Sequence, residues 1–215
     1  MAGHENVEGP GRSGFSGKDG AGVNLYDHPP VDGRVVCVDE FGPLNTQPRP
    51  GRGWFSARRP RRLRATYRRT QGVRHMFGAL DLSSGQLSYR IRDRKRWTEF
   101  LAFVKSLRAR WPGQTLYLTW DNYSVHKRAE IRAWCAANAV ELVFLPTYSS
   151  WLNRIECEFA ALRYFALNGT DYRSHGEQDD ATGTYVRWRN QHAGPVGDFA
   201  VGSKTRHPDY LPTVA

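Results

Sequence analysis

The chain has 215 residues, 40% of them apolar and 13% aromatic, which fits one domain with a real core and excludes a disordered chain. It has no apolar run long enough for a membrane helix and no apolar stretch of a secretory signal at its start, so we expect a cytoplasmic protein without a membrane partner. Thirty-one Lys and Arg residues against 21 Asp and Glu residues give a net charge of +10, which favours a polyanionic partner.

Cysteine usage excludes a disulfide framework and a common type of zinc site. Three cysteines are present, and no two of them form a Cys-x-x-Cys pair. Each lies in an apolar segment, so we predict three buried thiols at Cys37, Cys135 and Cys157.

The chain divides into three parts by composition. Residues 1–30 are rich in glycine and polar residues without periodicity, which predicts a disordered or loosely packed leader. Residues 31–195 carry regular hydrophobic patterns and form the predicted folded domain, and residues 196–215 are assigned as a C-terminal tail.

Five segments have the pattern of strands. Short apolar runs that indicate buried strands occupy 34–39, 115–121 and 140–145, and the first two end in an aspartate. Residues 73–82 and 86–92 flank Ser83-Ser84-Gly85, which predicts a hairpin.

Four helices are expected from apolar spacing and end signals. They cover 97–111, about 127–138, a segment that Asn153 can cap and that ends near Asn168-Gly169, and 177–190. Three strands in a meander followed by two crossovers predict an α/β domain with a mixed five-stranded sheet and helices on both faces. This strand order is the one expected of a ribonuclease-H-like fold.

The segment between Phe41 and Leu80 is strongly basic. It contains no acidic residue and ten arginines, the last of them Arg74. Because arginine binds phosphate through two donors and stacks on bases, this segment indicates contact with nucleic acid, although a solvated basic loop is the ordinary alternative. The predicted DNA-binding residues are Arg49, Arg52, Arg58, Arg59, Arg61, Arg62, Arg64, Arg68 and Arg69.

Three acidic residues fall where a sheet would bring them together. Asp39 and Asp121 each end a predicted strand, and the carboxyl ends of parallel neighbouring strands share one edge of the sheet. Glu156 lies one turn into the helix that follows the last strand. Hard divalent cations prefer such oxygen ligands, and two of them can support phosphodiester chemistry, so we predict a metal site here.

Each acid also has an ordinary interpretation, as a turn former, a helix cap or a first-turn glutamate. The neighbouring acids compete for the same role. Strand alternation should turn Glu40 away from Asp39. Glu158 lies about 200° around the helix from Glu156, and we expect it to be the more solvent-facing of the two because Glu156 borders the apolar face next to Phe159.

Three motifs together resemble the Asp-Asp-Glu catalytic domain of bacterial insertion-sequence transposases in the mariner-like superfamily. They are Val38-Asp39-Glu40-Phe41-Gly42-Pro43, Asp121-Asn122 with His126, and Pro146-Thr147-Tyr148-Ser149-Ser150-Trp151-Leu152-Asn153-Arg154-Ile155-Glu156. Asp121 and Glu156 are separated by 156 − 121 − 1 = 34 residues, the separation associated with that superfamily. The similarity runs from about Val35 to the end of the chain.

The resemblance implies that Asp39, Asp121 and Glu156 are catalytic metal ligands. It implies Mg²⁺ in a two-metal site, with Mn²⁺ as a substitute, and DNA cleavage at element ends followed by strand transfer into target DNA on the bacterial nucleoid. Asn122, His126 and Asn153 are expected to support the site, Asn153 by shaping the helix entry that aims Glu156. A homodimer acting on paired DNA ends is a further expectation.

The chain also departs from that pattern, because no helical region of the kind that reads element ends precedes the first predicted strand. We therefore expect a catalytic domain without its helix-turn-helix reader. One alternative is a catalytically silent remnant that only binds nucleic acid. Another is a different ribonuclease-H-like nuclease, such as a ribonuclease or a junction resolvase, against which the three motifs argue.

Overall fold

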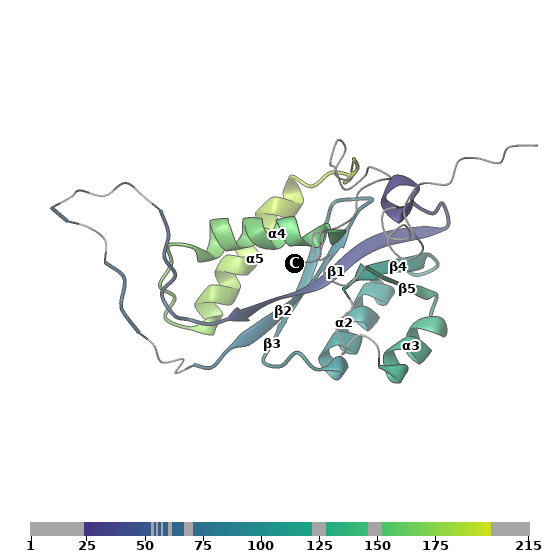
Figure 1. The fold of residues 1–215 in the computed structure, drawn as a ribbon, viewed down its shortest axis with the longest axis horizontal. Coiled ribbons are helices and arrows are strands. Elements are labelled where there is room, and N and C mark those ends of the chain that lie inside the picture. Colours follow the sequence, from purple (N-terminus) through teal and green to yellow (C-terminus); the bar gives the residue numbers. More distant parts are fainter. Residues whose placement is uncertain are drawn as a thin grey trace, which may run out of the picture.

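The computed structural model describes residues 24–198 except 53, 55, 57, 60–61, 67–70, 122–127 and 146–151. In this part of the chain a central sheet lies between two layers of helices (Figure 1). The predicted α/β class and the mixed five-stranded sheet are therefore confirmed.

The sheet has the order β3-β2-β1-β4-β5. Its strands are β1 (Gly33–Leu44), β2 (Arg74–Asp81), β3 (Leu87–Arg92), β4 (Thr115–Trp120) and β5 (Val140–Phe144). The first three form an antiparallel meander, and β4 and β5 add in parallel on the other side of β1. The central position of β1 places its residues at the junction of the antiparallel and parallel halves.

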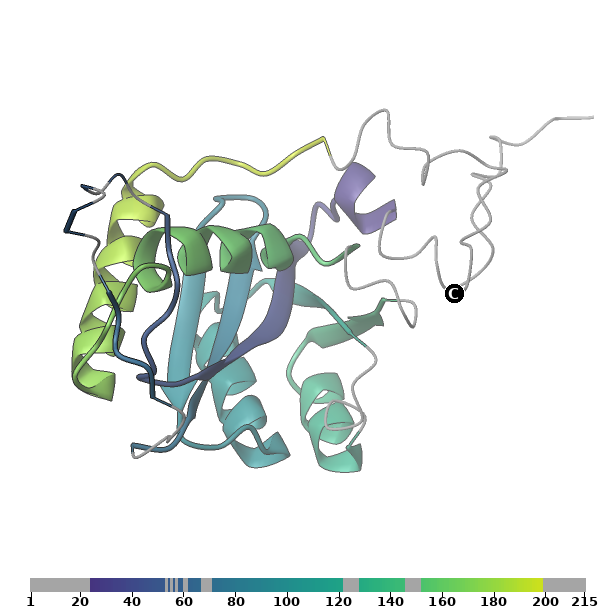
Figure 2. The same cartoon turned by 60° about the vertical axis from the view of Figure 1, so that its left-hand side comes forward.

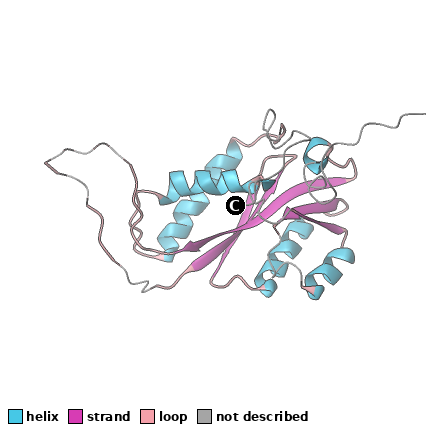
Figure 3. Cartoon of the chain, in the orientation of Figure 1, coloured by secondary structure: helices cyan, strands magenta, loops and turns pink. Residues whose placement is uncertain are grey.

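Helices cover both faces of the sheet (Figures 2 and 3). One face carries α2 (Trp97–Arg110) and α3 (Ala129–Ala136). The other carries α4 (Ile155–Leu162), its π-helical continuation η3 (Arg163–Leu167) and α5 (His175–Gln191). The side chain of Ser174 caps α5 by accepting a 3.1 Å hydrogen bond from the N–H of Glu177.

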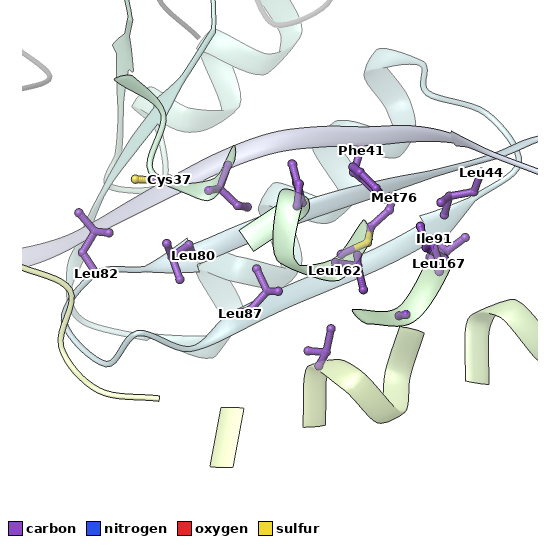
Figure 4. Packing of buried hydrophobic residues seen from close by; sticks show 14 of the residues in the cluster. Cys37, Phe41, Leu44, Met76, Leu80, Leu82, Leu87, Ile91, Leu162 and Leu167 are labelled. Carbon is purple, nitrogen blue, oxygen red and sulfur yellow. The ribbon is translucent and has the colours of Figure 1, made fainter. Parts of the chain in front are cut away.

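Alternation along β1 builds a separate core on each face. Val36 and Val38 pack with the α2 and α3 layer. Cys37 and Phe41 pack on the opposite face with β2, β3 and the helix formed by α4 and η3, where Figure 4 shows them with Met76, Leu80 and Leu162. Residue 39 has the same parity as 37 and 41, so Asp39 belongs to the α4 face.

The first strand is longer than predicted. We expected it to end at Asp39, but β1 continues to Leu44 because Phe41 and Leu44 are buried and keep pairing with β2. A register shift between Phe41 and Leu44 accommodates Gly42-Pro43, whose peptide bond is cis. Asp39 is therefore held inside a strand by pairing with β2 rather than at a loose strand end.

The last part of the predicted leader belongs to the folded part of the chain. Residues 24–27 form a short helix, from which Leu25 and Tyr26 pack against the core. The other end of the domain extends past residue 195, since the N–H of Val196 donates to the carbonyl of Leu82 at 2.8 Å. Residues 1–23 and 199–215, which hold the rest of the predicted leader and tail, lie outside the described residues.

Two of the three cysteines are buried, as predicted, and the third is not. Cys37 and Cys135 lie in the two cores. Cys157 is exposed because it lies on the outer side of α4, away from the sheet. No helix in the described ranges is long and apolar enough to cross a membrane.

Candidate active site

The two aspartates lie level with each other at the end of the parallel strand pair. Strands β1 and β4 pair in parallel register up to Cys37 and Thr119. Two further residues along the chain lead to Asp39, which lies inside β1, and to Asp121, which directly follows Trp120 at the end of β4. The observed register thus places the two aspartates level with each other at the carboxyl end of the parallel pair, where α/β sheets commonly carry their chemistry.

Helix α4 lies over the same edge because the sheet has no side chain at one key position. Gly78 on β2 pairs with Asp39. A Cβ atom at Gly78 would lie 2.7 Å from Cε1 of Phe159 and 3.0 Å from Cδ1 of Ile155, so any larger residue would push α4 away. Glycine inside a strand commonly marks such a close approach. Glu156, in the first turn of α4, is therefore positioned by the packing of Phe159 and Ile155 against Gly78.

Asn153 links the entry of α4 to the first aspartate. Its Nδ2 donates to the carbonyl oxygen of Val38 at 3.0 Å and to Oδ2 of Asp39 at 3.1 Å. Asn153 is 1% exposed. The expected capping role is wrong: α4 begins after Arg154, no side chain caps it, and Asn153 uses its amide to hold Asp39.

The environment of Asp39 strongly disfavours an uncompensated negative charge. The side chain is 9% exposed. Burial is the largest cause that raises the pKa of Asp39 to about 7, and the negative charges of Asp121, Glu156 and Glu40 add to it. A 2.7 Å hydrogen bond from the N–H of Glu40 lowers that pKa in part. Asp121 and Glu156 are therefore close enough to Asp39 to repel its carboxylate.

These residues fit a divalent cation. A buried carboxylate with a raised pKa, flanked by two further carboxylates, is a set of hard oxygen ligands whose repulsion a cation would relieve. Beside them, Oδ1 of Asn153 is buried and accepts no hydrogen bond within the described part of the chain. Among the described residues, no three or more acidic, His or Cys side chains are grouped so that they could hold a metal ion, so the assignment of the three carboxylates as metal ligands rests on the electrostatics of Asp39 and on the sequence motifs.

The two competing acids are engaged elsewhere. Oε2 of Glu40 lies 3.5 Å from Nζ of Lys95, as expected for a side chain that points away from Asp39. Glu158 forms a two-pronged ion pair with Arg189 of α5, at 2.5 and 2.9 Å. The expected burial order of the helix glutamates is wrong, since Glu158 is partly buried under α5 and Glu156 is exposed. Glu158 is thus occupied by a structural contact, and Glu156 retains the closer electrostatic link to Asp39.

The predicted DNA-binding arginines fall into three groups. Arg52, Arg58, Arg59 and Arg62 are exposed. Arg64 binds Asp171 through two nitrogens at 2.5 and 2.9 Å. Arg49 is half-buried, and its backbone forms hydrogen bonds with Gly169 and Thr170. Arg49 and Arg64 therefore anchor the arginine-rich segment to the fold. Arg61, Arg68 and Arg69 lie outside the described residues, as do Asn122 and His126 of the predicted site.

Sequence reasoning missed two residues that support the site. Gly78 could have been found as the glycine inside an otherwise apolar strand. Tyr26 lay in the predicted leader, yet its hydroxyl donates to the carbonyl of Leu152 at 3.0 Å and thereby fixes the residue before Asn153. Burial raises the pKa of Tyr26 well above its ordinary value, so this hydroxyl stays a donor.

Comparison with known proteins agrees with this geometry. The family model described as DDE superfamily endonuclease matches residues 34–178. An uncharacterized 39 kDa protein of insertion element IS630 from Shigella sonnei is 31% identical over 90 residues, which are 41% of this chain and 26% of that protein. The chain thus spans about a quarter of that relative's length.

Solved structures share the fold. The Mos1 transposase paired-end complex with the left transposon end matches with a TM-score of 0.59 and 15% identity, covering 89% of this chain and 62% of that chain. The Mos1 mariner paired-end complex with Mn matches with a TM-score of 0.60 and 14% identity over the same shares. These structural neighbours confirm the predicted ribonuclease-H-like fold. Because the family model covers more than half of the chain and includes Asp39, Asp121 and Glu156, the chain belongs to the DDE superfamily endonuclease family.

Proposed function

We propose that this domain cuts DNA strands and joins them to new sites during transposition, using Asp39, Asp121 and Glu156 as ligands of divalent metal ions. The single observation that carries the proposal is the state of Asp39: a buried carboxylate with a pKa raised to about 7, facing the charges of Asp121 and Glu156. A fold does not keep such a repulsive arrangement for stability, and perturbed carboxylates of this kind cluster at functional sites.

Each supporting residue has a role in that site. Asn153 fixes the carboxyl group of Asp39 through its amide, and Gly78 lets α4 bring Glu156 over the sheet. The bound ions, which we propose to be two Mg²⁺ with Mn²⁺ as a substitute, would activate an attacking hydroxyl group and stabilise the leaving oxygen of the phosphodiester. Removing one ligand should therefore remove cleavage without removing the fold.

The proposed substrate is DNA, and the basic charge supports it. The exposed arginines of the segment that follows β1 can neutralise phosphates, and the Mos1 neighbours are structures with a transposon end. Those neighbours are paired-end complexes, so we include a homodimer on two DNA ends in the proposal. Arginine–phosphate contacts give affinity without sequence preference, so these arginines would hold DNA without selecting particular element ends.

Plasmid nicking with purified protein tests the proposal. We expect nicking that requires Mg²⁺ or Mn²⁺ and that is lost, by on the order of a hundredfold or more, in Asp39→Asn, Asp121→Asn and Glu156→Gln. Glu158→Gln is the matched control, because it changes the same residue type two positions along the same helix, and it should keep most of the activity. DNA binding without any metal-dependent nicking would identify a silent binding domain and refute the catalytic proposal.

A further inference from the structure

A second basic feature lies at the outer edge of β3, apart from the acidic edge of the sheet. Here α2 lies on one face of the sheet and α5 on the other (Figures 1 and 2), and residues of both helices and of β3 line a cavity of about 280 Å³. Its floor is β3 near Tyr89, and its walls include Phe103 and Leu107 of α2 and Val186 of α5. We call this cavity the β3-edge groove.

Three arginines from three different elements line the groove. They are Arg90 of β3, Arg110 of α2 and Arg187 of α5, and all three are exposed. Arg110 donates to Oγ of Ser88 at 2.6 Å, and Arg187 donates to Oγ1 of Thr184 at 3.0 Å. Over the described ranges no carboxylate forms an ion pair with any of the three, so their charges are not neutralised within the fold.

The edge strand adds backbone donors and is closed to a further strand at one end. The side chain of Asn190 on α5 bonds both the N–H and the carbonyl of Leu87, at 2.9 and 2.8 Å. Because outward-facing backbone groups alternate along an antiparallel edge, the N–H and the carbonyl of Tyr89 also face outward, and the carbonyl accepts from Nη1 of Arg90 at 3.4 Å. Asn190 blocks an added strand at Leu87, and the arginines with the Tyr89 N–H form a set of donors suited to an anion.

The groove is level with the acidic site. Asp39 pairs with Gly78, and Gly78 pairs with Tyr89, so the groove lies two strand spacings, about 10 Å, across the sheet from β1. Acidic residues are present on the α5 side, where the charges of Asp179 and Asp180 reach Tyr89, but Asp179 is bound by Arg74. The net charge facing the groove is positive.

We propose that the β3-edge groove binds the phosphodiester backbone of DNA, with Arg110 and Arg187 each contacting one phosphate. Arginine presents two parallel donors that match two phosphate oxygens. A charge that serves only to solvate the surface does not need this geometry. The inference rests on the proposed function in taking DNA as the ligand, and it adds a binding surface on the side of the sheet opposite to β5. Its role is to hold DNA rather than to take part in cleavage.

Duplex binding in EDTA tests the groove separately from chemistry. Fluorescence anisotropy of a labelled duplex, measured from about 50 to 200 mM salt, gives the slope of log K against log salt. We compare the wild type with Arg110→Gln/Arg187→Gln and with the control Arg128→Gln/Arg132→Gln, which removes two exposed arginines near the other edge of the sheet. Circular dichroism checks that all three proteins are folded.

The groove variant should bind at least about tenfold more weakly at 0.1 M salt, with a slope shallower by about 1.8, since each phosphate contact contributes about 0.9. Each single substitution should account for about half of the change in slope. A groove variant that binds DNA like the control variant would overturn the proposal that the groove binds DNA. Binding of an acidic protein segment to the wild type but not to the groove variant would then identify such a segment as the partner instead. Failure of the wild type to bind DNA at low salt would overturn the proposed function together with the groove.

Discussion

At the scale of single residues, the candidate site centres on one carboxyl group whose ionised form is disfavoured by burial and by neighbouring negative charges. Asp39 is buried, and its pKa is raised to about 7 by burial first and by the neighbouring acids second. A raised folded-state pKa means that the folded protein keeps a proton that the unfolded chain has already lost at the same pH. The stability of the metal-free protein should therefore depend on pH in a defined direction.

Without metal, the free energy of unfolding of the wild type should fall relative to that of Asp39→Asn as pH rises from about 4 to about 7, and should level off above. The contribution of protonated Asp39 is complete below its unfolded-state pKa and is lost through its folded-state pKa. One pKa unit corresponds to about 1.4 kcal/mol, so the total change amounts to a few kcal/mol. Urea unfolding in EDTA measures the difference in unfolding free energy between the two proteins. A difference that does not change with pH would rule out a raised pKa of Asp39.

Asn153 should matter for metal binding more than for folding. Asn153→Ala removes the amide that bonds Oδ2 of Asp39 at 3.1 Å and the carbonyl of Val38. We expect a loss of about 1–3 kcal/mol in unfolding free energy and a metal affinity about 10- to 100-fold weaker, as for other groups that orient metal ligands. Urea unfolding and Mn²⁺ titration measure the two effects. Unchanged metal affinity in a stable Asn153→Ala protein would show that Asn153 serves the fold alone.

At the scale of elements, the approach of α4 to β2 sets the position of Glu156. Gly78→Ala places a methyl group within about 3 Å of Phe159 and Ile155, so α4 must shift. Overpacking of this kind typically costs about 1–3 kcal/mol. We expect nicking activity to fall further than the loss of folded protein explains, and Phe159→Leu to restore part of both stability and activity in the double variant. Additive losses in the double variant would argue against this packing contact.

The elements themselves could be predicted from sequence to different degrees. Apolar runs and turn residues indicated all five strands, because alternation and burial are local properties of the pattern. The extension of β1 through Gly42 and Pro43 could not be predicted, because pairing with Met76 and Arg74 of β2 maintains it over residues that usually end a strand. Likewise, the reversed burial of Glu156 and Glu158 depends on where α5 lies, through Arg189, which periodicity within α4 does not contain.

At the scale of the whole molecule, the strand order explains why a candidate site could be predicted from the sequence. The motifs and the 34-residue separation predicted a site at Asp39, Asp121 and Glu156, and parallel pairing of β1 with β4 puts the two aspartates level. What the sequence did not contain were the contacts that complete the site across the fold. Asn153 is separated from Asp39 by 114 positions in the sequence, and Tyr26 from Leu152 by 126, so no local sequence pattern predicts either contact.

The central claim is that Asp39, Asp121 and Glu156 together bind one group of divalent cations. Mn²⁺ binding, followed by calorimetry in the wild type and in Asp39→Asn, Asp121→Asn, Glu156→Gln and the control Glu158→Gln, tests it most directly. We predict that each of the first three substitutions weakens binding by about tenfold or more, since each removes a hard oxygen ligand, and that the control binds like the wild type. Wild-type affinity in any of the three site variants, with the protein folded, would contradict the assignment of that residue, and wild-type affinity in all three would contradict the site.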